Sequence, residues 1–177
     1  MIERILEEAC YDFATRWIPQ TLAEKGWDCP EIVELSTWKT FLPTAIPSQA
    51  IVPVAGCSLE AGLLDAVRIR NAAVHRHLCD NAEIRKMAKQ GQNLMVMFSD
   101  VTRQDKFHRL WTELNNWDAR RDDDQGKRKR LQQALIEISE RPIDDMDWTP
   151  NDLSLQEITG EAVQESEEMY VDEMELD

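Results

Sequence analysis

The chain has 177 residues, of which 42% are hydrophobic, and it contains six Trp but only six Gly and seven Pro. This composition favours one all-helical domain with a proper core. No run of 18 apolar residues is present, which argues against a membrane-spanning helix. Of the 34 acidic residues, 13 follow Pro142, whereas all 20 Lys and Arg precede it. We therefore predict a nearly neutral body, residues 1–142, and an acidic tail, residues 143–177, and we expect no broad basic face for nucleic acid.

Apolar residues at three- and four-residue spacing predict an amphipathic helix over residues 2–25, which ends at Gly26. Pro30 suits the first turn of a second helix, and Pro43 is expected to end it. Residues 43–57 contain three prolines. They predict a long and mostly extended loop, whose apolar side chains lie against the body.

Capping signals divide the middle of the chain. Ser58 is suited to cap a helix that runs to about Cys79, and Asp80 with Glu83 has the spacing of a capping box for the next helix. The apolar pattern changes phase near residues 99–105, which predicts a break between two helices. Together with a short last helix before residue 141, these signals predict an all-α bundle of five to six helices.

Charged segments flank the last helix. Residues 118–130 carry mixed charges and are predicted to form an exposed connection, in which Lys127–Arg130 forms a solvated helix face, a nuclear signal or a phosphate contact. The tail mixes acids with scattered apolar residues. Such a segment is typical of chains that are disordered alone and fold on a partner, although parts of it could instead dock on the body.

The helix predicted over residues 58–78 contains the most chemically suggestive residues. On a helical wheel Arg70 lies in the apolar arc, as does His77, whereas His75 lies about 140° from Arg70. Because an isolated buried charge is costly, Arg70 needs a carboxylate partner. Arg70 is then either a paired packing residue or a cation that faces a cleft between helices, with His75 at the rim.

The segment Arg70-Asn71-Ala72-Ala73-Val74-His75 resembles the R-x4–6-H motif of HEPN domains, in which a polar residue often follows the arginine. The longer segment to Arg76 also looks like an R-[HN]-x-A-V-H-R signature of uncharacterised fungal helical proteins. HEPN domains are helical bundles, and many are metal-independent ribonucleases that act as dimers. The resemblance implies that Arg70 steadies the scissile phosphate and that His75 transfers protons, with Asn71 beside them. Arg68, Arg76 and His77 are further candidate binding residues.

Three hypotheses follow. The first is a non-enzymatic helical interaction or scaffold domain, whose tail binds a protein partner or folds back on the body. The second is a HEPN-type metal-independent endoribonuclease or RNA-binding domain that acts as a homodimer. The third is a nuclear regulatory protein, whose tail recruits other proteins and whose Lys127–Arg130 run gives nuclear entry. His75 and Cys79 are spaced like metal ligands, but no second ligand pair is evident, so we expect no metal or cofactor. The acidic N-terminus and widely spaced cysteines predict an intracellular protein, cytoplasmic or nuclear.

Overall fold

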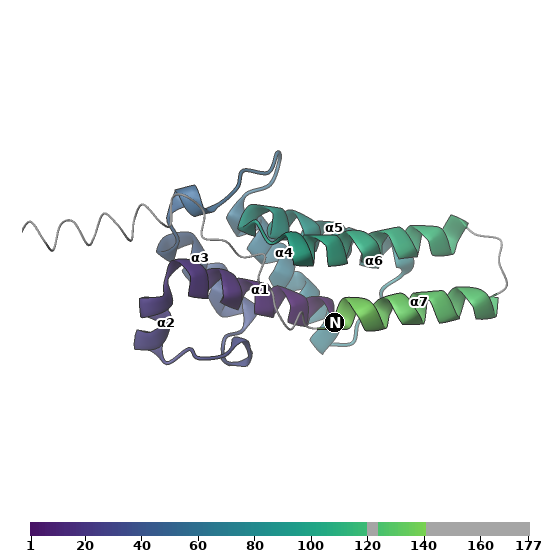
Figure 1. Cartoon of the computed structure of the whole chain (residues 1–177), viewed down its shortest axis with the longest axis horizontal. Coiled ribbons are helices and arrows are strands. Elements are labelled where there is room, and N and C mark those ends of the chain that lie inside the picture. The colour runs from purple at the N-terminus through teal and green to yellow at the C-terminus, as the bar shows by residue number, and fades with distance from the viewer. Residues whose placement is uncertain (120–123, 141–177) are drawn as a thin grey trace, which may run out of the picture. The chain divides into compact units, whose positions relative to one another are not determined.

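The computed structural model describes residues 1–119 and 124–140. The described residues form seven α-helices and two short 3-10 helices, so the all-α prediction is confirmed (Figure 1). The predicted tail, residues 143–177, lies outside the described residues. The helices are α1 (Ile2–Trp17), α2 (Pro19–Lys25), α3 (Leu35–Ala45), α4 (Leu59–Val74), α5 (Asn81–Phe98), α6 (Val101–Ala119) and α7 (Asp124–Ser139), with 3-10 helices η1 (Pro30–Ile32) and η2 (Ser48–Ala50).

The helix predicted over residues 2–25 is two helices. Ile18 separates α1 from α2 with φ −138° and ψ 47°, and Pro19 opens α2. Proline disfavours the helical conformation in the residue before it and lacks an N–H, so the chain breaks at Ile18. Gly26 ends α2 in the left-handed conformation, as predicted.

The second predicted helix starts later and ends later. Only η1 forms at Pro30, and α3 begins after the extended Glu34. Pro43 lies inside α3 instead of ending it, because the packing of Leu42 and Ile46 into the core outweighs one lost backbone hydrogen bond. The following loop lies against the body as predicted, since the Val52 N–H bonds the carbonyl of Met97 at 3.0 Å.

The capping predictions are confirmed. The Ser58 hydroxyl accepts from the Ala61 N–H at 3.2 Å, and Asp80 with Glu83 forms the complete capping box. α5 and α6 pack closely because position 91 is glycine. A Cβ placed on Gly91 would lie 2.7 Å from the ring of Phe107, so only glycine allows this approach.

The predicted connection over residues 118–130 is mostly helical. α6 continues to Ala119 and α7 already begins at Asp124, so the basic run Lys127–Arg130 lies on a helix. α7 runs back along α6 (Figure 1), and the side chain of Arg109 on α6 forms an ion pair with Glu137 on α7. The last helix was predicted, but its first turns were not, because the charged residues before Leu131 give no apolar pattern.

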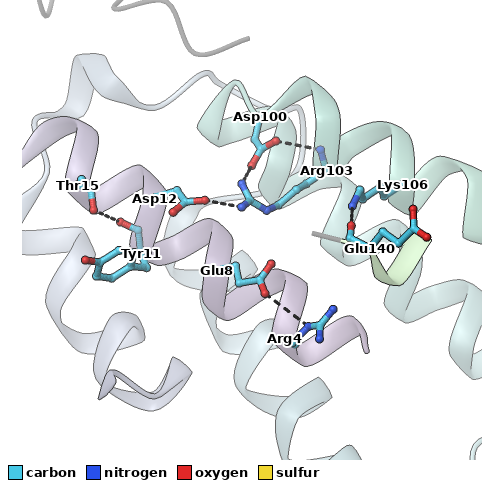
Figure 2. Close-up of polar contacts among 9 residues, drawn as sticks. All are labelled: Arg4, Glu8, Tyr11, Asp12, Thr15, Asp100, Arg103, Lys106 and Glu140. Atoms are coloured by element: carbon cyan, nitrogen blue, oxygen red, sulfur yellow. Dashed lines mark hydrogen bonds and ion pairs between the residues drawn. The ribbon is translucent and has the colours of Figure 1, made fainter. Parts of the chain in front are cut away.

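α1 lies at the centre of the helix contacts and touches α3, α4 and α5. Its charged residue Asp12 also reaches the buried Arg103 on α6, which Asp100 holds from the turn before α6 (Figure 2). The Arg103 Nη1 lies 2.6 Å from the Asp100 Oδ2. No described helix is long and apolar enough to cross a membrane. The core is built from apolar residues of all the long helices, including Leu6, Phe13, Trp38, Leu63, Met95, Phe98, Phe107, Leu110 and Ile138.

Candidate functional site

The candidate residues lie at the end of α4 and in the turn that joins it to α5. α4 ends in a Schellman motif, in which the His77 N–H bonds the Ala72 carbonyl at 2.9 Å. Arg76 adopts the left-handed conformation with φ 51°, at a position where glycine is usual. The prediction of a helix to Cys79 is therefore wrong, because the chain turns after His75.

Arg70 has its carboxylate partner within the chain. Its Nη2 lies 2.9 Å from the Oε1 of Glu34, the residue that precedes α3. The Arg70 side chain is 28% exposed and that of Glu34 is 58% exposed. The predicted need for an acidic partner is confirmed, but the pair lies at the edge of the core and not deep inside it.

Other carboxylates lie close to this ion pair. Burial raises the pKa of Glu7 on α1, and the negative charges of Glu3, Glu34 and Glu31 raise it further. Arg70 is the cation that opposes this shift. Arg70 therefore belongs to a group of carboxylates contributed by α1, η1 and the residue before α3. Its positive charge is balanced by these carboxylates within the fold.

The two histidines lie beyond the end of the helix. The imidazole rings of His75 and His77 stack with their centroids 6.0 Å apart, and both side chains are exposed. Helical periodicity placed His77 in the apolar arc with Arg70, and that prediction is wrong because α4 has already ended. The structure thus brings two histidines together and directs Arg70 to Glu34 instead.

The remaining predicted residues point to solvent. Asn71 and Arg76 are exposed. Arg68 is also exposed and pairs at 3.2 Å with Asp65, one turn earlier on the same helix. These residues frame the turn, but an exposed pair of this kind contributes little to stability.

Two apolar side chains in the same turn are exposed. Leu78 is 100% exposed and Val74 is 52% exposed. They flank His75 and His77 in sequence, so the turn presents aliphatic and imidazole groups side by side. We call residues 74–78 the α4–α5 turn. Its chemistry suits contact with another macromolecule, since imidazole donates and accepts hydrogen bonds while the aliphatic groups gain from burial.

Sequence reasoning missed Glu34 as the partner of Arg70. Glu34 was expected inside a helix that began at Pro30, whereas the structure places it in an extended link before α3. No local signal connects it with Arg70, which lies 36 positions later in the sequence. Only the packing of α3 against α4 brings the two residues together.

A second polar region lies between α6 and α7. An open hollow of only about 10 Å³ is lined by Glu113, Asn116, Trp117, Lys127, Arg130 and Leu131. Arg128, Lys129 and Arg130 are exposed, so much of the basic run faces solvent from α7. The hollow is shallow and its lining carries both signs of charge, which gives it no clear preference for an anion.

The four cysteines, Cys10, Cys29, Cys57 and Cys79, are all free. Burial raises the pKa of Cys10, which makes it an unreactive core thiol. Among residues 1–119 and 124–140, no group of three or more His, Cys, Asp or Glu could hold a metal ion. Comparisons of the chain with protein-family models, curated proteins and solved structures give no match.

Proposed function

We propose that this chain is a non-enzymatic helical interaction domain that contacts a partner protein through the α4–α5 turn. The observation that carries the proposal is the complete exposure of Leu78 beside the half-exposed Val74. Burying a leucine side chain is worth about 1.5–3 kcal/mol, so a partner that covers the turn gains affinity. The capping box at Asp80 and the Schellman motif before it hold the turn in place.

The charges near Arg70 support an interaction domain over a ribonuclease. Cleavage of RNA through its 2′-hydroxyl needs a cation that is available to the phosphate. Arg70 is engaged by Glu34, and Glu7 lies close enough to be influenced by its charge. A phosphate that approached Arg70 would meet these carboxylates, and like charges repel.

Site-specific crosslinking tests the interaction proposal. A photoreactive amino acid in place of Leu78 is expected to capture a defined partner in extracts of the source cells. The matched control is the same amino acid in place of Val101, which is 56% exposed on α6. An excess of the parent chain without the photoreactive group should reduce formation of the adduct, whereas the same excess of Leu78→Asp should not. Equal capture at both positions, or capture at neither, would contradict the proposal. An adduct of twice the chain mass would identify the partner as a second copy.

An RNA-cleaving function is the second candidate, and the paired histidines favour it. Two imidazoles with centroids 6.0 Å apart can serve as a general acid and a general base. In this arrangement His75 and His77 would transfer the protons, and the exposed Arg76 would be the available cation.

Incubation of the full chain and of residues 1–142 with single-stranded RNA separates the two candidates. The interaction proposal expects no cleavage by either. Cleavage that is lost in His75→Ala and His77→Ala, but retained in His108→Ala, would establish the ribonuclease. In that case removal of the 13 acids after Pro142 should raise RNA affinity, because a negative tail repels phosphate.

Location and the acidic tail belong to the same proposal. The free cysteines support an intracellular protein, in which thiols stay reduced. The exposed basic residues of Lys127–Arg130 support entry to the nucleus. Residues 143–177 supply a second contact for the partner, as their mixture of acids and apolar side chains suggests.

A further inference from the structure

An aromatic cluster joins the end of α2 to α3. The rings of Trp27 and Phe41 meet edge to face, with centroids 5.2 Å apart and an interplanar angle of 81°. The ring of Trp38 lies 5.4 Å from Trp27, also edge to face, at 75°. Trp38 is fully buried, whereas Trp27 and Phe41 are half-buried. The rings of Trp27 and Phe41 therefore reach the surface, and the ring of Trp38 lies beneath them.

A cation already lies over the two outer rings. The Lys25 Nζ is 5.3 Å from the centroid of Trp27 and 5.1 Å from that of Phe41. Both distances are within the range of a cation–π interaction. One ammonium group thus interacts with two nearly perpendicular aromatic faces, which is the arrangement of an aromatic cage.

The backbone builds this arrangement. Lys25 is the last residue of α2, and Gly26 follows in the left-handed conformation at φ 66°. The Trp27 N–H then bonds the carbonyl of Leu22 at 2.9 Å. This turn folds Trp27 back against α3 and leaves Lys25 on the same side as the rings. A residue with a Cβ is strained at the position of Gly26.

Lys25 is a poor occupant of such a cage. Its ammonium group is strongly hydrated and the residue is exposed, so the interaction is worth about 0.5–1 kcal/mol. A trimethylated ammonium keeps the positive charge but has no N–H to hydrate. It loses less on leaving water and adds methyl contacts with the ring faces. A methylated ligand would therefore displace Lys25.

The charge around the cluster favours a basic ligand. Residues 1–45 contain eight Asp or Glu and four Lys or Arg. Glu24 and Asp28 flank the cage residues in sequence, and both are exposed. These carboxylates attract a positively charged peptide and repel the anionic lipids of a membrane surface.

We propose that Trp27 and Phe41, supported by the buried Trp38, form a cage for a trimethyllysine side chain in a basic segment of a protein partner, and that Lys25 occupies this cage in the free protein. The cage is built from the link after α2 and from α3, away in sequence from the α4–α5 turn. The proposal therefore goes beyond the function proposed above, and its failure would leave the Leu78 crosslinking result unaffected.

Isothermal titration calorimetry of the full chain tests this cage. The probe is a short basic peptide that contains one trimethyllysine, and the reference is the same peptide with unmodified lysine. The trimethylated peptide is expected to bind about tenfold more tightly. Lys25→Gln removes the internal competitor and should tighten binding a few-fold. Lys39→Gln, which makes the same charge change on α3, should not.

Trp27→Leu is expected to abolish the preference for trimethyllysine, with its fold checked by circular dichroism. Because the Lys25 side chain is exposed, Lys25→Gln remains decisive if Trp27→Leu fails to fold. Equal affinity for the two peptides, or weaker binding by Lys25→Gln, would overturn the proposal. So would binding to phosphatidylcholine vesicles without a preference between the peptides, because the cage would then serve a lipid headgroup.

Discussion

Two arginines of this chain occupy opposite kinds of environment. The Arg103 side chain is 3% exposed and is held by Asp12 and Asp100 from two other segments. Arg70 is 28% exposed and is held by Glu34. Burial alone would lower the pKa of Arg103, but the two carboxylates outweigh it and raise that pKa. An arginine within an apolar sequence pattern is therefore not enough to identify a functional site. How deeply its side chain is buried and how many carboxylates pair with it decide whether it is structural or available to a ligand.

Replacement of Arg103 by methionine should give the largest effect. Removal of the buried cation leaves Asp12 and Asp100 without the guanidinium that pairs with both of them. The free energy of unfolding is expected to fall by about 3 kcal/mol in urea titrations. A loss below about 1 kcal/mol would mean that solvent reaches the cluster and that the contrast with Arg70 is small.

Arg76→Gly should stabilise the chain. Arg76 holds the left-handed conformation at φ 51°, which glycine adopts without a Cβ penalty. We expect a gain of about 0.5–1 kcal/mol in the free energy of unfolding. The control is Arg68→Gly inside α4, which should cost about 1 kcal/mol. A lower free energy of unfolding for Arg76→Gly would show that contacts of the Arg76 side chain stabilise the fold by more than its left-handed backbone conformation costs.

Arg70→Met should have a smaller effect than Arg103→Met. Its ion pair with Glu34 is partly exposed, and such pairs are worth about 0.2–1 kcal/mol. A double-mutant cycle with Glu34→Gln measures the coupling directly. Coupling above about 2 kcal/mol would show that the Arg70–Glu34 pair stabilises the fold as strongly as a buried ion pair, so the two arginines would not differ in kind.

Glu7→Gln should have the smallest effect, and one that depends on pH. The pKa of Glu7 is raised in the folded state, so its ionisation lowers stability as the pH rises through that value. The melting temperature of Glu7→Gln should exceed that of the parent chain at pH 7 and match it at pH 4. Glu60→Gln should show the opposite sign at pH 7, because hydrogen bonds from its own N–H and from Ser58 lower the pKa of Glu60.

The sequence predicted the start of a helix correctly where a single capping residue determines it. Ser58 and Asp80 each bind the N–H groups of the first turn, so their caps could be recognised without knowing the fold. Pro19 is an equally local signal for the break at Ile18, although the apolar pattern of residues 2–25 predicts one continuous helix. Pro43 misled in the other direction, because packing of the neighbouring apolar residues kept the helix intact.

The candidate site was less predictable because tertiary contacts define it. The end of α4 has no glycine, so nothing in the sequence marked the turn at Arg76. Glu34 meets Arg70 only through the packing of α3 on α4. The ammonium of Lys25 lies over Phe41 for a similar reason, since a turn and a helix must both form first.

The contact between Arg4 and the carbonyl of Ser139 has a consequence for synthesis on the ribosome. The two residues are 135 positions apart. At roughly 5–20 residues per second, about 7 to 27 seconds pass between their additions to the chain. Asp12 likewise waits for Arg103, 91 positions later. Until α4 and α5 are added, the apolar side of α1 also lacks part of its cover, which makes the nascent helix a natural substrate for chaperones.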